Sequence, residues 1–165
     1  MGAGKTTVGR QLAKRLGKNF HDTDREIEAR TGVSVAVIFD IEGEAGFRKR
    51  EAEVIEHLTA RDDIVLATGG GAVLDPRNRE HLKSRGFVIY LHALPPVLWQ
   101  RTRTDKSRPL LQGADPRERL ESLYAVRDPL YRDAADLVVD TGRQGIGPLI
   151  TQVLARIDEA CRLSA

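Results

Sequence analysis

Residues 2–7, with the sequence G-A-G-K-T-T, constrain the fold more than any other part of this chain. They match the second half of the phosphate-loop motif G-x-x-x-x-G-K-[ST]. Glycines let backbone N–H groups crowd around phosphate oxygens, and a following helix points its positive end at the anion. Lys5 can reach the β- and γ-phosphates of a nucleotide, and the Thr6 hydroxyl can coordinate Mg²⁺. The alternative, a glycine-rich turn capped by a threonine, is disfavoured because an amphipathic helical pattern follows directly.

The phosphate-loop motif is incomplete at its start. Gly4 is the sixth position of the motif, so the first glycine would fall two residues before Met1. The buried strand that feeds such a loop is missing as well, which would leave backbone groups of its neighbours in the sheet unpaired. We therefore expect Met1 to be an internal methionine, with roughly ten residues missing upstream, a strand plus the loop entry. The alternative is a natural fragment with no activity.

Strand patterns and helix patterns alternate along the 165 residues. Continuous apolar runs are typical of strands buried on both faces, whereas apolar residues three or four apart indicate helices. The expected strands cover residues 19–22, 64–67, 87–92 and 137–140, and the expected helices residues 6–16, 24–31, 35–42, 44–60, 76–86, 95–102, 116 onward and 148–163. This alternation predicts an α/β fold with three α/β/α layers and a central parallel sheet, of the phosphate-loop kinase type, whose first and central strand is missing from the chain.

Composition limits the classes of function. The 165 residues predict one domain, and the net charge of +2, from 26 Lys plus Arg against 24 Asp plus Glu, gives no reason to expect nucleic acid as a partner. No apolar run approaches the length of a membrane span, so no membrane is expected. Cys161, the only cysteine, excludes an intrachain disulfide and fits the cytoplasm; we expect it to be buried or unreactive.

Two pairs of charged residues are candidates for a binding site. Asp22 and Asp24 alternate along an extended segment, so both carboxylates can face the same side, although helix capping by Asp24 explains the pattern about as well. Arg48 and Glu51 are three apart on a predicted helix, close enough for the carboxylate to orient the guanidinium. A fixed guanidinium suits a carboxylate ligand, and the alternative is a solvated ion pair on the helix surface.

Two loops complete the candidate features. Gly69, Gly70 and Gly71 follow the predicted strand 64–67, where backbone N–H groups can approach a ligand at the carboxyl edge of the sheet. A simple flexible turn would rarely need three glycines in succession. No acidic residue stands at the usual Walker B position after this strand. Residues 103–113 are polar and aperiodic, and we interpret them as a mobile loop rather than a domain linker.

These features resemble the shikimate kinase family in their order and spacing, over about residues 1–160. The matching segments are the phosphate loop, D-T-D at 22–24, F-R-K-R-E at 47–51, T-G-G-G-A at 68–72, R-P-L-L at 108–111, R-D-P-L-Y at 127–131 and V-D-T-G-R-Q at 139–144. The resemblance implies transfer of the γ-phosphate of Mg·ATP to the 3-hydroxyl of shikimate, in aromatic amino acid biosynthesis. It also implies a lid at about 103–113, a substrate-binding helical region at about 24–60, and a monomer.

The resemblance assigns a role to each candidate residue. ATP would be bound by Gly2, Ala3, Gly4, Lys5, Thr6, Thr7, Arg101, Arg108 and Gln144; Mg²⁺ by Thr6 and Asp22; and shikimate by Asp24, Arg48, Gly69, Gly70, Gly71 and Arg127. Lys5, Asp24 and Arg108 would be catalytic, with Asp22 meeting the metal through water. Some members of the family carry an arginine where Gln144 stands, so the neighbouring Arg143 is an alternative there.

Three rival functions stay open at the level of sequence. A gluconate-type kinase shares the phosphate loop and fold, and a nucleoside monophosphate kinase is a more distant candidate. A truncated, non-catalytic relative that binds nucleotide or shikimate is supported by the incomplete start. Binding without product formation would identify the last of these.

Overall fold

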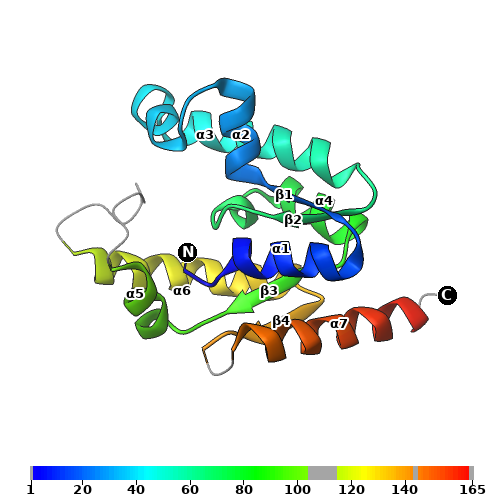
Figure 1. Cartoon of the computed structure of the whole chain (residues 1–165). Helices are drawn as coiled ribbons and strands as arrows, with labels where there is room; N and C mark the ends of the chain where they lie inside the picture. The colour runs from blue at the N-terminus through cyan, green and yellow to red at the C-terminus, as the bar shows by residue number, and fades with distance from the viewer. Residues whose placement is uncertain (1, 104–114, 143–144, 164–165) are drawn as a thin grey trace.

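The glycine loop at the N-terminus leads directly into a helix, and strands and helices then alternate to the C-terminus (Figure 1). The structure, a computed structural model, describes residues 2–103, 115–142 and 145–163. The elements are α1 (Lys5–Leu16), β1 (Asn19–Asp22), α2 (Thr23–Thr31), α3 (Val35–Thr59), β2 (Ile64–Ala67), the 3-10 turn η1 (Ala72–Leu74), α4 (Pro76–Arg85), β3 (Ile89–His92), α5 (Pro95–Thr102), α6 (Pro116–Ala134), β4 (Leu137–Asp140) and α7 (Ile146–Leu163). The α/β class is therefore confirmed.

The four strands form two parallel pairs. β1 pairs with β2 in the register Asn19↔Ile64 to Asp22↔Ala67, and β3 pairs with β4 in the register Ile89↔Leu137 to His92↔Asp140. Among the described residues, β2 and β3 are not paired with each other, so the expected single central sheet is replaced by two small parallel sheets. Each strand there has a hydrogen-bonded neighbour on one edge only. The expected strand before the phosphate loop stays a prediction.

Helices nevertheless cover two faces of the strands, as the layered prediction requires. On one face, α1 and α7 build a core with β4 from side chains such as Leu12, Val139 and Val153, and Val65, Ile89 and Leu91 pack against it. This core joins the two parallel pairs. Ile64 and Leu66, which flank Val65 in β2, point to the other face of the strand. They pack against a second core that α2 and α3 build. The alternation along β2 is that of a strand with helices on both sides.

Several helix starts follow from their capping residues. Ser34 accepts a hydrogen bond from the Val37 amide at 3.4 Å before α3, and Asp75 accepts one from the Arg77 amide at 2.8 Å before α4. The two helices expected at 35–42 and 44–60 are one element, α3, with a break at Gly43, where φ is 71°. A side chain would be strained at that angle.

Three details of the prediction are wrong. β3 begins at Ile89 rather than at residue 87, and Phe87 is 38% exposed. β2 and β3 are mostly half-buried rather than fully buried, because each is paired along one edge only in the described part of the chain. Cys161 is exposed near the end of α7, so of the two expected alternatives it is not buried, and its lack of reactivity stays a prediction. Helix α7 starts at Ile146, two residues earlier than expected.

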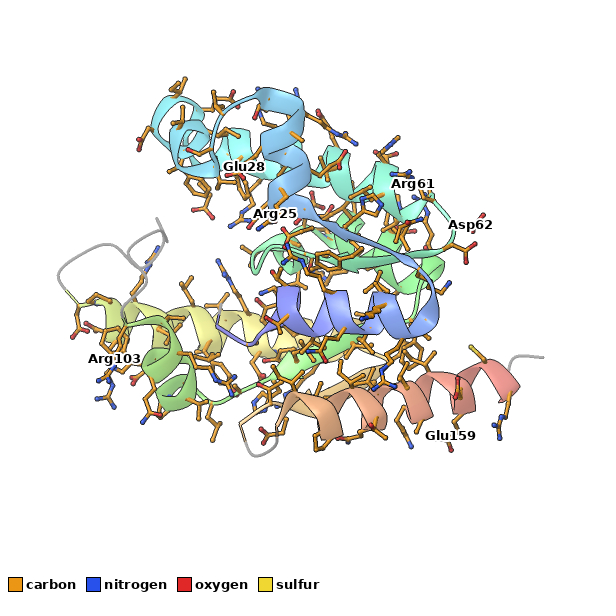
Figure 2. The ribbon with its side chains drawn as sticks, viewed as in Figure 1. Arg25, Glu28, Arg61, Asp62, Arg103 and Glu159 are labelled. Carbon is orange, nitrogen blue, oxygen red and sulfur yellow. The ribbon has the colours of Figure 1, made fainter. Side chains whose placement is uncertain are left out.

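Charged side chains of both signs are spread over the surface. Figure 2 shows acidic and basic residues side by side on several elements, for example Arg25 and Glu28 on α2, and Arg61 beside Asp62 before β2. This mixture agrees with the low net charge and shows no continuous basic face in the view drawn. Within the described ranges, no helix is long and apolar enough to cross a membrane.

Candidate functional site

A cleft of about 450 Å³ joins the glycine loop to the carboxyl ends of β1 and β2. It brings together segments that are far apart in the sequence: the start of α1, the end of β1, the middle of α3, the loop after β2, and one arginine each from α5 and α6. Its lining residues are Gly2, Gly4, Lys5, Thr6, Thr7, Asp22, Asp24, Val35, Phe39, Phe47, Arg48, Glu51, Thr68, Gly69, Gly70, Gly71, Arg101 and Arg127. Most of the predicted site residues therefore meet in one place.

The glycine loop has the backbone conformation that an anion site requires. Gly2 and Gly4 have φ of 70° and 87°, angles that L side chains rarely adopt. A Cβ at Gly2 would lie 2.7 Å from Thr102 Cγ2, so this position also lacks room for a side chain. Gly4 is the N-cap of α1 and no side chain caps the helix, which rules out the alternative of a threonine-capped turn. The first turn of α1 is left open towards the cleft.

Ala3 differs from its neighbours in the loop. It packs against the apolar cluster of Ala93, Leu98 and Leu120 instead of lining the cleft. Its side chain thus anchors the loop to α5 and α6. Any contact of Ala3 with a nucleotide would come from its backbone.

Thr6 and Asp22 meet at the floor of the cleft. The Thr6 hydroxyl donates a hydrogen bond to Asp22 Oδ2 at 3.1 Å, joining α1 to the end of β1. The other carboxylate oxygen of Asp22 accepts hydrogen bonds from the amides of Asp24 at 3.1 Å and Arg25 at 3.5 Å. Asp22, not Asp24, is therefore the N-cap of α2, and the capping alternative for Asp24 is wrong. The backbone turns into the helix at residue 23, which leaves Asp24 in the first turn.

Asp24 faces the cleft from the first turn of α2. Its Oδ1 is buried and has no hydrogen-bond partner among the described residues. Burial, and then the neighbouring negative charge of Asp22, raise the pKa of Asp24, while Lys5 and Arg48 lower it to a smaller extent. A buried carboxylate with an unused acceptor atom costs free energy unless a ligand supplies the partner. A ligand hydroxyl would be such a partner.

Arg48 is held by two carboxylates of its own helix. Its Nη1 donates to Glu51 Oε2 at 2.7 Å, and its Nη2 donates to Glu44 Oε1 at 3.0 Å. The Glu51 side chain is fully buried, whereas Glu44 is 47% exposed. Burial raises the pKa of Glu51, and the charge of Arg48 partly offsets that rise. The predicted orientation of Arg48 by Glu51 is thus present, and the pair is not a solvated one.

The glycine loop after β2 lies directly against this pair. A Cβ at Gly69 would collide with Glu51 Oε1, and one at Gly71 would collide with the Arg48 guanidinium. The Gly69 amide donates to Thr23 Oγ1 at 2.9 Å, so this N–H is already used within the protein. Only a backbone without side chains can approach so closely. A side chain at 69 or 71 would therefore have to displace Glu51 or Arg48.

Arg101 enters the cleft from α5 and Arg127 enters it from α6. Arg127, on α6, is only 4% exposed, and it lies close enough to Glu51 to lower the pKa of that carboxylate. Arg101, on α5, donates to the Thr141 carbonyl at 2.7 Å and to the Thr141 hydroxyl at 3.1 Å. It also donates to the Gly2 carbonyl at 3.4 Å. Arg101 therefore ties the phosphate loop to the loop after β4.

Some predicted site residues lie outside the part of the chain that the structure describes. These are Arg108 and nearly all of the expected lid, together with Arg143 and Gln144. Other residues of the site were missed by the sequence interpretation. Val35, Phe39 and Phe47 form an apolar wall, and the rings of Phe39 and Phe47 are tilted by 36° with their centroids 4.8 Å apart. The only sequence signal of Val35 and Phe39 was apolar periodicity, which also marks ordinary core residues, whereas Phe47 belongs to the F-R-K-R-E segment but was given no role in the site.

One end of the cleft can bind phosphates and the other can bind a small polar acid. Backbone amides, a lysine and a helix N-terminus gather at the first end, and two arginines with a buried carboxylate gather at the second. Among the described residues, no three His, Cys, Asp or Glu side chains gather around a metal position. A hydroxyl and one carboxylate are nevertheless the oxygen ligands with which proteins hold Mg²⁺ beside substrate phosphates.

Comparison with known proteins points in the same direction. The sequence model of the family described as "Shikimate kinase" matches residues 1–158. A shikimate kinase of Burkholderia lata is 61% identical over 160 residues, which cover 97% of this chain and 87% of the relative. The structure of "Shikimate kinase from Acinetobacter baumannii in complex with shikimate" superposes with a TM-score of 0.93 at 49% identity, covering 97% of this chain and 89% of the other. A gluconokinase from Sinorhizobium meliloti, with a TM-score of 0.58 and 17% identity, shares the fold alone.

Proposed function

Because this chain belongs to the shikimate kinase family, we infer that it transfers the γ-phosphate of ATP to the 3-hydroxyl of shikimate, giving shikimate 3-phosphate and ADP. One observation carries this conclusion. A single cleft has a phosphate loop at one end and the Arg48–Arg127 pair at the other. The nucleotide and the acid can therefore meet between the two ends, which is the positioning that phosphoryl transfer needs most. This reaction belongs to aromatic amino acid biosynthesis.

At the phosphate end, the first turn of α1 supplies the binding groups. We propose that the amides of residues 2–7 surround the β- and γ-phosphates, and that the Lys5 ammonium neutralises charge developing on the transferred group. Thr7, also in the lining of the cleft, contacts the phosphates from the same turn. Arg101 supports the nucleotide side through its contacts with Gly2 and Thr141. By the family resemblance, Arg108 and Gln144 would also bind ATP, and Arg108 would be catalytic as well.

Thr6 and Asp22 are the residues that would hold Mg²⁺. Their oxygen atoms lie 3.1 Å apart beside the phosphate loop, and the chemistry of this donor pair fits a magnesium ion that takes its remaining ligands from phosphate and water. When bound, the ion supplies positive charge to the β- and γ-phosphate oxygens. Asp22 keeps its second oxygen for capping α2, which fixes the direction of the carboxylate.

At the acid end, Arg48 and Arg127 bind the carboxylate of shikimate. Both guanidinium groups line the cleft, and Glu51 holds Arg48 in place. The Gly69 amide is engaged with Thr23, so we assign the remaining backbone contacts of the loop to the amides of Gly70 and Gly71, with Gly69 providing space. The bidentate fork of arginine suits a carboxylate better than an ammonium group does.

Asp24 lies between the two ends and serves the hydroxyl that reacts. Its unpartnered Oδ1 accepts a hydrogen bond from the 3-hydroxyl and takes up the proton as the hydroxyl oxygen bonds to the γ-phosphorus. The bond between the γ-phosphorus and the β–γ bridging oxygen breaks in the same step, and this oxygen leaves as part of ADP. The raised pKa of Asp24, caused first by burial, makes it a stronger proton acceptor than an exposed aspartate. The apolar wall of Phe39 and Phe47 limits the entry of water beside it.

One chain supplies both ends of the cleft, so we propose a single kinase domain that acts as a monomer. The helical region at about 24–60 carries Asp24, Arg48 and Glu51, and residues 103–113 would form the lid. Size-exclusion chromatography with light scattering tests the monomer. A dimer whose dissociation abolishes turnover would contradict it.

A substrate panel tests the reaction. Purified chain is assayed for ADP release from Mg·ATP with shikimate, gluconate, AMP or CMP, and we expect release above background with shikimate alone. Lys5→Ala should abolish turnover, whereas Lys14→Ala, an exposed lysine on the same helix, should not. Release with gluconate or a nucleotide, but not with shikimate, would overturn the assignment. Shikimate binding by calorimetry without ADP release would indicate the non-catalytic alternative.

A further inference from the structure

The hydroxyl of Tyr131 connects two elements at the acid end of the cleft. Tyr131 lies on α6, one helical turn after Arg127, and its O–H donates a hydrogen bond to the carbonyl oxygen of Gly70. Burial raises the pKa of Tyr131, while the charge of Arg127 and its hydrogen bond to the Tyr131 side chain lower it. One phenol group therefore contacts both the glycine loop and the guanidinium that we assign to the carboxylate.

The contact with Gly70 fixes the orientation of a whole peptide group. The peptide between Gly70 and Gly71 is trans, as are all peptide bonds of the described residues. In a trans peptide the C=O and the following N–H lie in one plane and point in opposite directions. Because Tyr131 holds the Gly70 carbonyl, the Gly71 N–H is directed away from Tyr131. Gly71 in turn lies so close to the Arg48 guanidinium that a side chain there would collide with it.

A fixed orientation is not something that two consecutive glycines provide by themselves. Glycine reaches both signs of φ at little cost, so a Gly–Gly peptide can rotate when nothing holds it. The ends of this loop are anchored elsewhere: the Gly69 amide donates to Thr23, and the carbonyl of Ala72 accepts a hydrogen bond from buried Asn78 at 3.0 Å. The Tyr131 hydroxyl holds the peptide between these two anchors.

We propose that Tyr131 is a positioning residue for the substrate carboxylate: its hydroxyl orients the Gly70–Gly71 peptide and Arg127 together, so that the Gly71 N–H and the Arg127 guanidinium act on the same carboxylate. This inference rests on the proposed function. Tyr131 contacts Gly70 and Arg127, which both line the acid end of the cleft, so we expect its replacement to affect the binding of the acid.

The same helix offers a matched control. Tyr124, two turns before Tyr131 on α6, is half-buried like it, and its hydroxyl is hydrogen-bonded to His92 Nε2 at 2.9 Å. Tyr124 does not line the cleft. Replacing Tyr124 with phenylalanine removes a hydroxyl of the same chemistry from the same helix without touching the glycine loop.

The test compares Tyr131→Phe and Tyr124→Phe in the full chain. We expect Tyr131→Phe to raise KM for shikimate about tenfold and to weaken shikimate binding by calorimetry about equally, since one partly buried hydrogen bond is lost. kcat at saturating shikimate and KM for ATP should stay within about twofold. Tyr124→Phe should change neither shikimate constant by more than about twofold. The melting temperatures of both variants report on any general loss of structure.

Three results would overturn the inference. One is an unchanged KM for shikimate in Tyr131→Phe while the unaltered chain turns over normally, which leaves the proposed function intact. Another is an equal rise in both variants, or equal rises for ATP and shikimate, because that pattern reflects a loosened α6. The third is an unaltered chain that neither binds nor phosphorylates shikimate, which removes the proposed function and this inference together.

Discussion

Arg48 Nη1 lies 2.7 Å from Glu51 Oε2, and the Glu51 side chain is completely buried while that of Arg48 is 21% exposed. The buried carboxylate thus holds the guanidinium from the interior of the protein. The second partner of Arg48, Glu44, is 47% exposed. Two carboxylates of very different burial therefore hold one arginine, and their contributions to substrate binding can be separated.

Glu51→Gln should raise KM for shikimate about tenfold with little change in kcat. The substitution keeps the size of the side chain but removes the charge that fixes Arg48, and charge-assisted hydrogen bonds of this kind contribute roughly 1.5–3 kcal/mol. Glu44→Gln is the matched control. Because exposed ion pairs contribute only about 0–1 kcal/mol, it should change KM by about twofold or less. Equal effects of the two variants on steady-state KM for shikimate would show that the burial of Glu51 does not matter for fixing Arg48 against the substrate carboxylate.

Asp24→Asn should lower kcat by about 10²–10⁴-fold if Asp24 takes the proton of the hydroxyl. The pH profile gives a second readout. Burial and Asp22 raise the pKa of Asp24 above its ordinary value of 3.8, and the base form appears only as pH rises through that raised pKa. The kcat/KM profile should therefore have an acid limb at higher pH than an exposed aspartate gives, and the residual activity of Asp24→Asn should lack it. Near-full kcat in Asp24→Asn would exclude an essential base.

Asp22→Asn should raise the Mg²⁺ concentration needed for half-maximal activity, since it removes the charge beside the Thr6 hydroxyl. Asparagine is as good an N-cap as aspartate, so the start of α2 should survive and the melting temperature should change little. Asp22→Ala loses the cap as well, and should cost about 1 kcal/mol of stability in addition. An unaltered Mg²⁺ dependence in a well-folded Asp22→Asn variant would remove Asp22 from the metal site.

Gly9→Ala should destabilise the fold by about 1–3 kcal/mol, because an added Cβ on α1 would lie 2.6 Å from Cε2 of Phe20 on β1. Gly147→Ala is the control on α7, where an added Cβ meets no atom within 4 Å. It should be neutral or stabilising by up to about 1 kcal/mol, since alanine is the better helix former. Urea unfolding measures both. A Gly9→Ala variant as stable as the unaltered chain would show that Phe20 moves aside at little cost.

Local features of this fold were predictable from the sequence. The α1 helix, the strand at 19–22, and the caps Ser34 and Asp75 depend on residues close together in the chain, and local patterns determine them. The pairing of strands was not predictable in the same way. β1 pairs with β2 more than forty residues later, and the pattern of neither strand says which edges stay unpaired.

The same difference between local features and contacts of distant segments applies to the candidate site. Motif residues such as Lys5, Asp24, Arg48 and Arg127 were found because each belongs to a short segment with a characteristic spacing, and they do line one cleft. Contacts between distant segments were missed. The Thr23–Gly69 and Tyr131–Gly70 hydrogen bonds join residues 46 and 61 positions apart. Nothing in the sequence around Thr23 or Tyr131 identifies the glycine to which each is bonded.

Phosphorus NMR of the reaction with Mg·ATP and shikimate shows where the phosphate goes and therefore tests the proposed phosphorylation of shikimate. We predict a new phosphomonoester signal that grows with ADP and couples to the proton on carbon 3 of shikimate. The signal should disappear in the Arg48→Ala, Arg127→Ala double variant at low shikimate. Release of inorganic phosphate alone, or phosphorylation of a different hydroxyl, would contradict the account.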